Sequence, residues 1–149
     1  MPEKPYIPIL LGTGRKNRQS GKVARYIADQ AKQQKLFSTE IIDVRDFATD
    51  ITQPSWEEPT PDKVRQLSDK MSAIDGLIIV TPEYSHGYPG ELKIFLDKLD
   101  DELNHKPIGL CGVSSGGFGG SRVIELLLPV LIAFKACPVI PAVYFSKVE

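Results

Sequence analysis

Cysteine and histidine are scarce in this chain, each occurring only twice in 149 residues. Two cysteines are too few for a disulfide scaffold, and the positions Cys111 and Cys137 are not spaced like a metal-binding clip. Both lie in or beside apolar runs, which favours buried thiols in a reducing compartment. We therefore expect no metal site and a cytoplasmic protein.

An excess of one charge and a long apolar run are also missing. Eighteen Lys and Arg residues against nineteen Asp and Glu residues give a net charge of -1, which argues against a binder of duplex nucleic acid. No apolar run approaches the roughly 20 residues needed to cross a membrane. The N-terminus lacks the basic-then-apolar layout of a secretory signal peptide. The length and the 42% of hydrophobic residues suit one domain, residues 1–149, with a sizeable core.

Short apolar runs alternate with segments of helical periodicity along the chain. The expected strands are residues 6–11, 40–44, 76–80, 107–113 and 138–145. The expected helices are residues 21–34, 61–74, 91–103 and 120–134. Nearly continuous apolar strands are typical of parallel strands covered on both faces. The alternation predicts an α/β fold, a doubly wound five-stranded parallel sheet in the flavodoxin-like order 2-1-3-4-5.

This topology also predicts where a ligand binds. In such sheets, ligands bind outside the carboxyl ends of the strands, at the switch point between strands one and three. The loops after the first, third and fourth strands should therefore form one site. They are residues 12–22, 81–90 and 112–122, and all three are chemically unusual.

The first loop, GTGRKNRQSGK, combines hydroxyl groups with cations and leads into a helix N-terminus. Such a helix start favours an anion, and Arg15 and Arg18 can add charge-assisted bonds to a phosphate. The loop is not a P-loop, since the Gly-Lys-Ser/Thr ending is absent, and it lacks the third glycine of the dinucleotide fingerprint. A solvated basic loop capped by Ser20 is the alternative interpretation.

The second loop, TPEYSHGYPG, is built from stiff, flat and small residues. Pro82 fixes the backbone, and Gly87 permits a tight turn. Tyr84 and Tyr88 offer flat faces with a polar tip, so the loop suits a flat heterocycle read by hydrogen bonds along one edge. The alternative is a structural turn with surface tyrosines. Nothing nearby supplies a nucleophile for His86 to activate, so we expect no general acid–base role.

The third loop, GVSSGGFGGSR, carries the adjacent serines Ser114 and Ser115 and two glycine pairs. Glycines let the backbone approach a ligand closely, whereas a mobile glycine-rich turn is the alternative. Three such loops at the three positions expected to form the site favour a binding role.

These residues resemble the NAD(P)H-dependent FMN reductases of flavodoxin-like fold, a family that includes quinone and azo-dye reductases. GTGR at 12–15 with Ser20 is similar to the family's Gly-Ser-x-Arg phosphate loop. PEY at 82–84, PGELK at 89–93 and Asp97 are similar to its Pro-Glu-Tyr-Asn…Pro-Gly-x-Leu-Lys…Asp signature. GGFGGSR at 116–122 resembles its glycine motif. Thr13 stands where serine is usual, and Ser85 where asparagine is usual.

The resemblance implies FMN as the cofactor and NADPH or NADH as the electron donor. It implies thirteen cofactor-binding residues, divided among the three loops. For the phosphate they are Thr13, Arg15, Arg18 and Ser20; beside the isoalloxazine, Pro82, Glu83, Tyr84, Ser85 and His86; and on its other side, Ser114, Ser115, Gly116 and Gly117. Asp97 is expected to be structural.

The implied reaction passes a hydride from NAD(P)H through FMN to a quinone, an azo compound or a second flavin, with no catalytic side chain. The resemblance also implies a homodimer or homotetramer, and residues 120–134 are apolar almost all round, as an interface would require. The alternatives are a flavodoxin-type electron carrier and a non-catalytic FMN-binding module. A carrier usually needs a strongly acidic docking face, which a net charge of -1 does not supply.

The end of the chain departs from the family. Relatives continue into a last helix that covers one sheet face, whereas this sequence stops at Glu149, soon after the fifth expected strand. We expect a domain shortened at its C-terminus, with Ile140, Ala142, Tyr144 or their neighbours uncovered and FMN retention in doubt. Cover by a partner subunit is the alternative.

Overall fold

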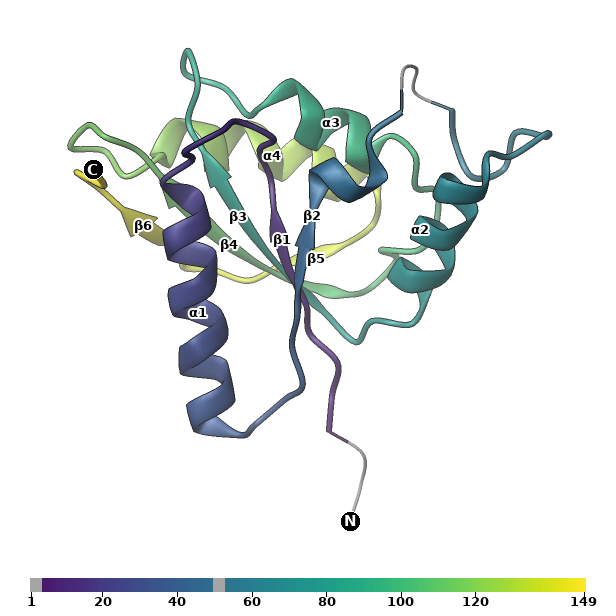
Figure 1. Ribbon diagram of the computed structural model, residues 1–149, viewed down its shortest axis with the longest axis horizontal. Coiled ribbons are helices and arrows are strands. Elements are labelled where there is room, and N and C mark those ends of the chain that lie inside the picture. The colour runs from purple at the N-terminus through teal and green to yellow at the C-terminus, as the bar shows by residue number, and fades with distance from the viewer. Residues whose placement is uncertain (1–3, 50–52) are drawn as a thin grey trace.

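The computed structural model describes residues 4–49 and 53–149, and its core is a parallel sheet. The strand order is β2-β1-β3-β4-β5, which confirms the expected topology, and β6 pairs with β4 off this path. The strands are β1 (Ile9–Leu11), β2 (Ile41–Asp43), β3 (Leu77–Pro82), β4 (Pro107–Val113), β5 (Cys137–Pro138) and β6 (Val143–Phe145). Figure 1 shows that the loops following β1, β3 and β4 lie together at the upper edge of the sheet.

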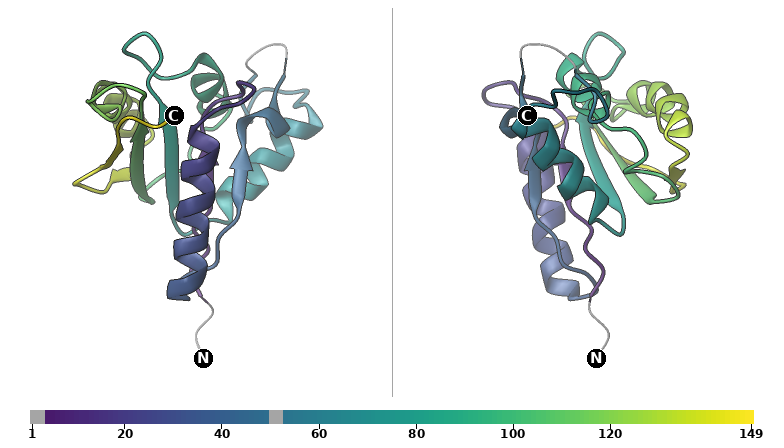
Figure 2. Two further views of the ribbon diagram at one scale, coloured as in Figure 1. Left: turned by 60° about the vertical axis from the view of Figure 1, so that its left-hand side comes forward. Right: turned by 90° about the vertical axis from the view of Figure 1, so that its right-hand side faces the viewer.

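Helices cover both faces of the sheet. Helix α1 (Ser20–Gln34) packs on one face, and α2 (Asp62–Ser72), α3 (Gly90–Leu96) and α4 (Ser121–Ala133) pack on the other. The right-hand view of Figure 2 shows α1 and α4 on opposite sides of the strands. A short 3-10 helix, η1 (Val44–Phe47), follows β2.

The two packing layers follow from the side-chain alternation of the strands. In β1, Leu10 belongs to the hydrophobic cluster under α2, α3 and α4, whereas Ile9 and Leu11 belong to the cluster under α1. All three are at most 4% exposed, because successive side chains of a strand point to opposite faces. The central strands are therefore buried on both faces, and their carboxyl ends are held in a fixed arrangement.

The helix predicted over residues 91–103 is wrong in its second half. Helix α3 ends at Leu96, and Leu99 N–H donates to the Leu96 carbonyl oxygen (2.9 Å) in a tighter, three-residue turn. Lys98 is 1% exposed, and its ammonium donates to the Phe47 carbonyl oxygen (2.7 Å). A buried ammonium requires such a partner, so this contact accompanies the departure from regular helix.

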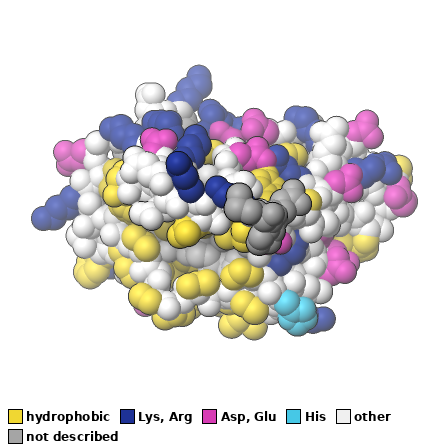
Figure 3. Space-filling view, turned by 90° about the horizontal axis from the view of Figure 1, so that it is seen from below, with side chains coloured by type: hydrophobic (Ala, Val, Ile, Leu, Met, Phe, Trp, Pro, Cys, Tyr) yellow, Lys and Arg dark blue, Asp and Glu magenta, His cyan; other side chains and the backbone are white. Residues whose placement is uncertain are grey.

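The single strand predicted over residues 138–145 is also wrong. Residues 139–142 separate β5 from β6, and Pro141 in this segment has no N–H to donate to a sheet ladder. Ile140 (68%) and Tyr144 (50%) are exposed, as expected, whereas Ala142 is half-buried against the core. Viewed from below, hydrophobic side chains gather along one edge of the molecule and most charged side chains along the other (Figure 3).

Candidate functional site

The three loops predicted to meet do meet, and they enclose a cleft of about 370 Å³ at the carboxyl ends of β1, β3 and β4. Every loop contributes to its lining. The lining residues are Arg15, Lys16, Asn17, Arg18, Gln19, Ser20, Pro82, Glu83, Tyr84, Val113, Ser114, Ser115 and Val148. Eight of these are among the thirteen residues singled out from the sequence.

The N-terminus of α1 forms one end of the cleft. Ser20 is 1% exposed, and its hydroxyl oxygen has no hydrogen-bond partner among the residues that the structure describes. Gln19 precedes the helix without a side-chain cap, and the first turn holds no acidic residue. The positive end of the helix dipole therefore faces the cleft beside an unused hydroxyl group, an arrangement that favours an anion.

Arg18 lines the cleft, but its guanidinium group is already engaged by other groups of the protein. It forms a two-pronged ion pair with the Asp43 carboxylate at the end of β2, with Nη1 lying 3.1 Å from Oδ1. It also donates to the Thr13 carbonyl oxygen. Arg18 thus joins the first loop to β2, a contact that the sequence did not suggest.

The Asp43 carboxylate is largely buried, with a side chain 14% exposed. Burial alone raises the pKa of Asp43, but hydrogen bonds from Arg18 and Arg45 outweigh this effect and lower the pKa from 3.8 to about 2. The ion pair is therefore intact at neutral pH.

We expect Asp43→Asn to lower the free energy of unfolding at pH 7 by about 2 kcal/mol. A carboxylate whose pKa is lower in the folded state than in the unfolded chain stabilises the fold at pH values above the unfolded pKa. This contribution is present above about pH 4 and is lost as the pH falls toward 2, so the two proteins should converge in acid. Urea unfolding at several pH values measures the difference. A gap that stays constant from pH 7 to pH 2 would contradict the pairing, and Asp69→Asn on α2 is the exposed control.

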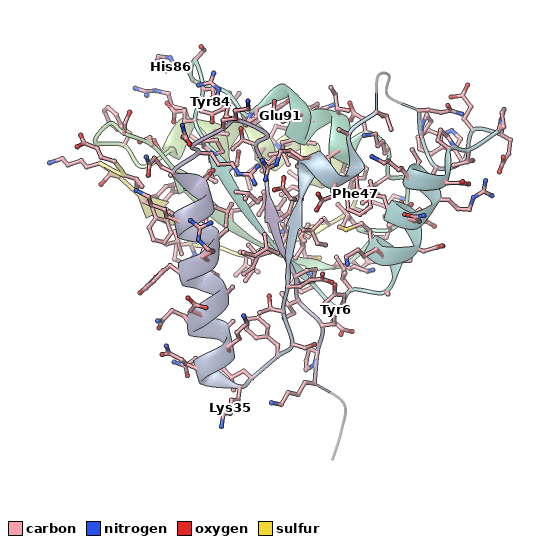
Figure 4. The ribbon with its side chains drawn as sticks, viewed as in Figure 1. Tyr6, Lys35, Phe47, Tyr84, His86 and Glu91 are labelled. Carbon is pink, nitrogen blue, oxygen red and sulfur yellow. The ribbon has the colours of Figure 1, made fainter. Side chains whose placement is uncertain are left out.

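The second loop is a tight turn that presents Tyr84 to the cleft. Tyr84 and Gly87 exchange two backbone hydrogen bonds of 2.9 Å, and Ser85 (φ 49°) and His86 (φ 65°) take the left-handed conformations. These are the conformations of a two-residue hairpin turn, so the expected tight turn is present, but Ser85 and His86 carry its left-handed backbone in place of Gly87. Ser85 and His86 are exposed and do not line the cleft; Figure 4 shows His86 at the outer tip of the loop.

Tyr84 itself is held on both sides. The Arg15 guanidinium carbon lies 3.7 Å from the centre of the Tyr84 ring, a cation–π contact. The Tyr84 hydroxyl oxygen lies 3.2 Å from Thr13 Oγ1. Thr13 is fully buried and does not line the cleft, unlike the other three residues predicted for the phosphate.

The third loop brings Ser114 and Ser115 to the opposite wall. Ser114 is fixed by the end of β6 and the residues after it, since its N–H donates to the Phe145 carbonyl oxygen (3.0 Å) and its carbonyl oxygen accepts from Val148 N–H (3.2 Å). Gly116 and Gly117 are exposed and lie outside the lining, with open space around both.

Glu83 contributes a buried carboxylate to the cleft. One oxygen accepts from the Arg122 guanidinium (3.0 Å), and the other is buried without a partner in the described part of the chain. Asp97 pairs with Lys93 one turn earlier (2.6 Å) on the outer side of α3, a contact within its own segment.

The sequence interpretation missed Glu91, which lies in the first turn of α3 and accepts from Gly14 N–H (2.8 Å) and Thr13 Oγ1 (3.2 Å). Burial raises the pKa of Glu91, but these hydrogen bonds and the charge of Arg15 lower it below the ordinary value. An acidic residue directly after Pro-Gly was the available signal. Within residues 4–49 and 53–149, no cluster of His, Cys, Asp and Glu could hold a metal ion, and no helix has the length and apolarity to cross a bilayer.

Comparison with known proteins places these features in context. Residues 5–149 match the protein family described as NADPH-dependent FMN reductase. The NAD(P)H-dependent FMN reductase of Schizosaccharomyces pombe is 29% identical over 164 residues, covering 99% of this chain and 79% of its own. The quinone reductase of Escherichia coli is 34% identical over 142 residues, covering 91% of this chain and 74% of its own. An oxidoreductase structure from Corynebacterium diphtheriae shares the fold, with a TM-score of 0.79 at 23% identity over 99% of this chain and 84% of that one.

Proposed function

The chain belongs to the NADPH-dependent FMN reductase family, and from this premise we propose that its cleft binds FMN for electron transfer from NADPH or NADH to a small-molecule acceptor. The single observation that carries the proposal is Ser20, whose buried hydroxyl has no partner in the described part of the chain and lies at a helix N-terminus that opens into a cleft rich in cations. A phosphate monoester fits this set of donors.

The phosphate end of the site consists of Ser20, Arg15 and the start of α1. Lys16 and Arg18 add positive charge around it, although Arg18 also forms an ion pair with Asp43. A buried hydroxyl group without a partner costs free energy, and a phosphate oxygen would accept its hydrogen bond. We propose that this gain distinguishes FMN from unphosphorylated riboflavin.

The ring end of the site lies between the second and third loops. Pro82 and Tyr84 on one side, and Ser114 and Ser115 on the other, provide flat or small surfaces with polar groups at their edges. The unpartnered oxygen of Glu83 can accept a hydrogen bond from a ring N–H. These side chains orient and bind; none of them is required to transfer a proton.

When bound, FMN supplies the redox chemistry, accepting a hydride from the nicotinamide and delivering electrons to the acceptor. His86 is exposed at the turn tip and away from the cleft lining, which supports a reaction without a histidine base. We propose quinones as one acceptor class, in keeping with the name of the E. coli relative.

The proposal is tested by soaking the purified protein in FMN, removing free flavin by desalting, and recording the visible spectrum before and after anaerobic NADPH. Retained flavin absorbance that bleaches on addition of NADPH is the expected result. Flavin that stays bound without bleaching would indicate a carrier or a binding module. No binding when the protein is titrated with excess FMN would contradict the cleft assignment.

We also propose that the protein forms a homodimer through α4. Leu126 (50% exposed) and Ile132 (66% exposed) give this helix an apolar outer surface. A helix that packs only on one sheet face normally has a polar outer surface. We expect Leu126→Glu combined with Ile132→Glu to yield a monomer, measured by sedimentation velocity at micromolar concentration. Tyr26→Glu on α1, which replaces another large exposed side chain (56%), is the control that should leave the dimer intact. A monomeric parent protein would refute the proposal.

A further inference from the structure

The partly buried carboxylate of Glu91 lies directly behind the loop proposed to hold the FMN phosphate. Its Oε1 accepts from the Gly14 N–H (2.8 Å) and from the Thr13 hydroxyl (3.2 Å), although 77 residues separate Glu91 from Gly14. Figure 4 shows Glu91 and Tyr84 together at the upper edge of the sheet. The contacts join α3 to the first loop from its protein side.

A negative charge at this place opposes the binding of an anion, since like charges at close range repel each other. The carboxylate of Glu91 must therefore contribute something to the loop that offsets this repulsion. The Gly14 N–H is a backbone donor next to a buried residue, and an unpaired donor there would be costly. Glu91 satisfies this donor and fixes the loop on which Arg15 and Ser20 depend.

The direction of the hydrogen bonds around Thr13 follows from the ionised carboxylate. Glu91 can only accept, so the single hydroxyl proton of Thr13 is donated to it. The Thr13 oxygen then accepts from the Tyr84 hydroxyl (3.2 Å) and from the Arg15 N–H (3.4 Å). Neither hydroxyl proton is left for a ligand, and Thr13 is fully buried.

We propose that Thr13 and Glu91 form a positioning pair that sets the shape of the first loop, and that Thr13 is not a direct ligand of the phosphate. The inference rests on the proposed FMN cleft and changes the role of one residue that the resemblance assigns to the phosphate. Direct phosphate contact is then left to Ser20, Arg15 and the start of α1.

The test compares FMN with riboflavin, which lacks the phosphate, by quenching of flavin fluorescence. We expect Glu91→Ala and Thr13→Val each to weaken FMN about tenfold, the loss typical of one charge-assisted hydrogen bond. Riboflavin should change by less than about twofold. The double variant should bind FMN no more weakly than either single variant, because both substitutions break the same connection.

Glu91→Gln separates positioning from charge. The amide oxygen still accepts from Gly14 N–H while the negative charge is gone, so FMN should bind as tightly as to the parent or more tightly. Thr13→Ser should likewise preserve binding, and Asp69→Ala on α2 is the control for loss of an exposed acid. Tighter FMN binding to Glu91→Ala, equal losses for FMN and riboflavin, or additive losses in the double variant would each overturn the proposal.

A second readout needs no flavin. Amide hydrogen exchange at Gly14 should accelerate about tenfold or more in Glu91→Ala, because the N–H loses its acceptor. An unchanged exchange rate of the Gly14 amide would overturn the proposed pair, whatever the result of the FMN titrations. Failure of the parent protein to bind FMN would instead contradict the proposed function. The exchange rate at Gly14 would then still test the pairing of Thr13 with Glu91.

Discussion

We expect Ser20→Asp to reduce the affinity for FMN at least about a hundredfold, because a carboxylate about 4 Å from a phosphate costs several kcal/mol even in a partly polar site. Ser20 is 1% exposed and lines the cleft, so the new charge has little solvent to screen it. An aspartate in the first turn of α1 interacts well with the helix dipole. The favourable helix dipole offsets the desolvation of this carboxylate, so the free energy of unfolding should change little while binding is lost.

Loss of binding without loss of stability is the diagnostic part of the experiment. Ser20→Ala, which removes only the hydroxyl group, should weaken FMN about tenfold. Ser121→Asp is the matched control, since Ser121 is the first residue of α4 and does not line the cleft. Titration with FMN and urea unfolding measure the two quantities. If Ser20→Asp still held FMN as tightly as the parent, the phosphate would have to bind elsewhere.

The layered fold could be read from the sequence because its signals are local. Buried parallel strands are almost uniformly apolar, and the predicted strand at residues 107–113 coincides with β4 (Pro107–Val113). The errors fall where a distant contact overrides the local pattern. Lys98 at the end of α3 is bound by the Phe47 carbonyl oxygen, 51 residues earlier, and periodicity does not encode such a pair.

The site was predictable to the level of its loops, and less so for single side chains. Parallel topology brings the three loops together, so Ser20, Tyr84 and Ser114 could be placed in one cleft from the strand order alone. Whether a side chain faces the ligand or the protein depends on partners such as Glu91 and Asp43. Their separations from Thr13 and Arg18 are 78 and 25 residues, beyond any local motif.

Gly112 lies at the place where β4 touches the start of α4 backbone to backbone. A Cβ atom on Gly112 would lie 2.6 Å from the Gly119 carbonyl oxygen and 2.9 Å from the Gly120 carbonyl oxygen. Gly119 (φ 61°) and Gly120 (φ 82°) have left-handed backbones, so the opposing chain is itself tightly constrained. No flexible side chain is available to move aside.

We expect Gly112→Ala to lower the free energy of unfolding by about 3 kcal/mol and the melting temperature by about 10 °C, because backbone must shift to admit the methyl group. The same shift displaces Ser114, two residues further along, so FMN and riboflavin should both bind more weakly. Gly116→Ala is the control, since its Cβ would meet nothing within 4 Å. Thermal unfolding of the two variants compares them directly. Equal stability would mean that the contact between β4 and the start of α4 is looser than its geometry implies, and the third loop could then not serve as a rigid wall of the cleft.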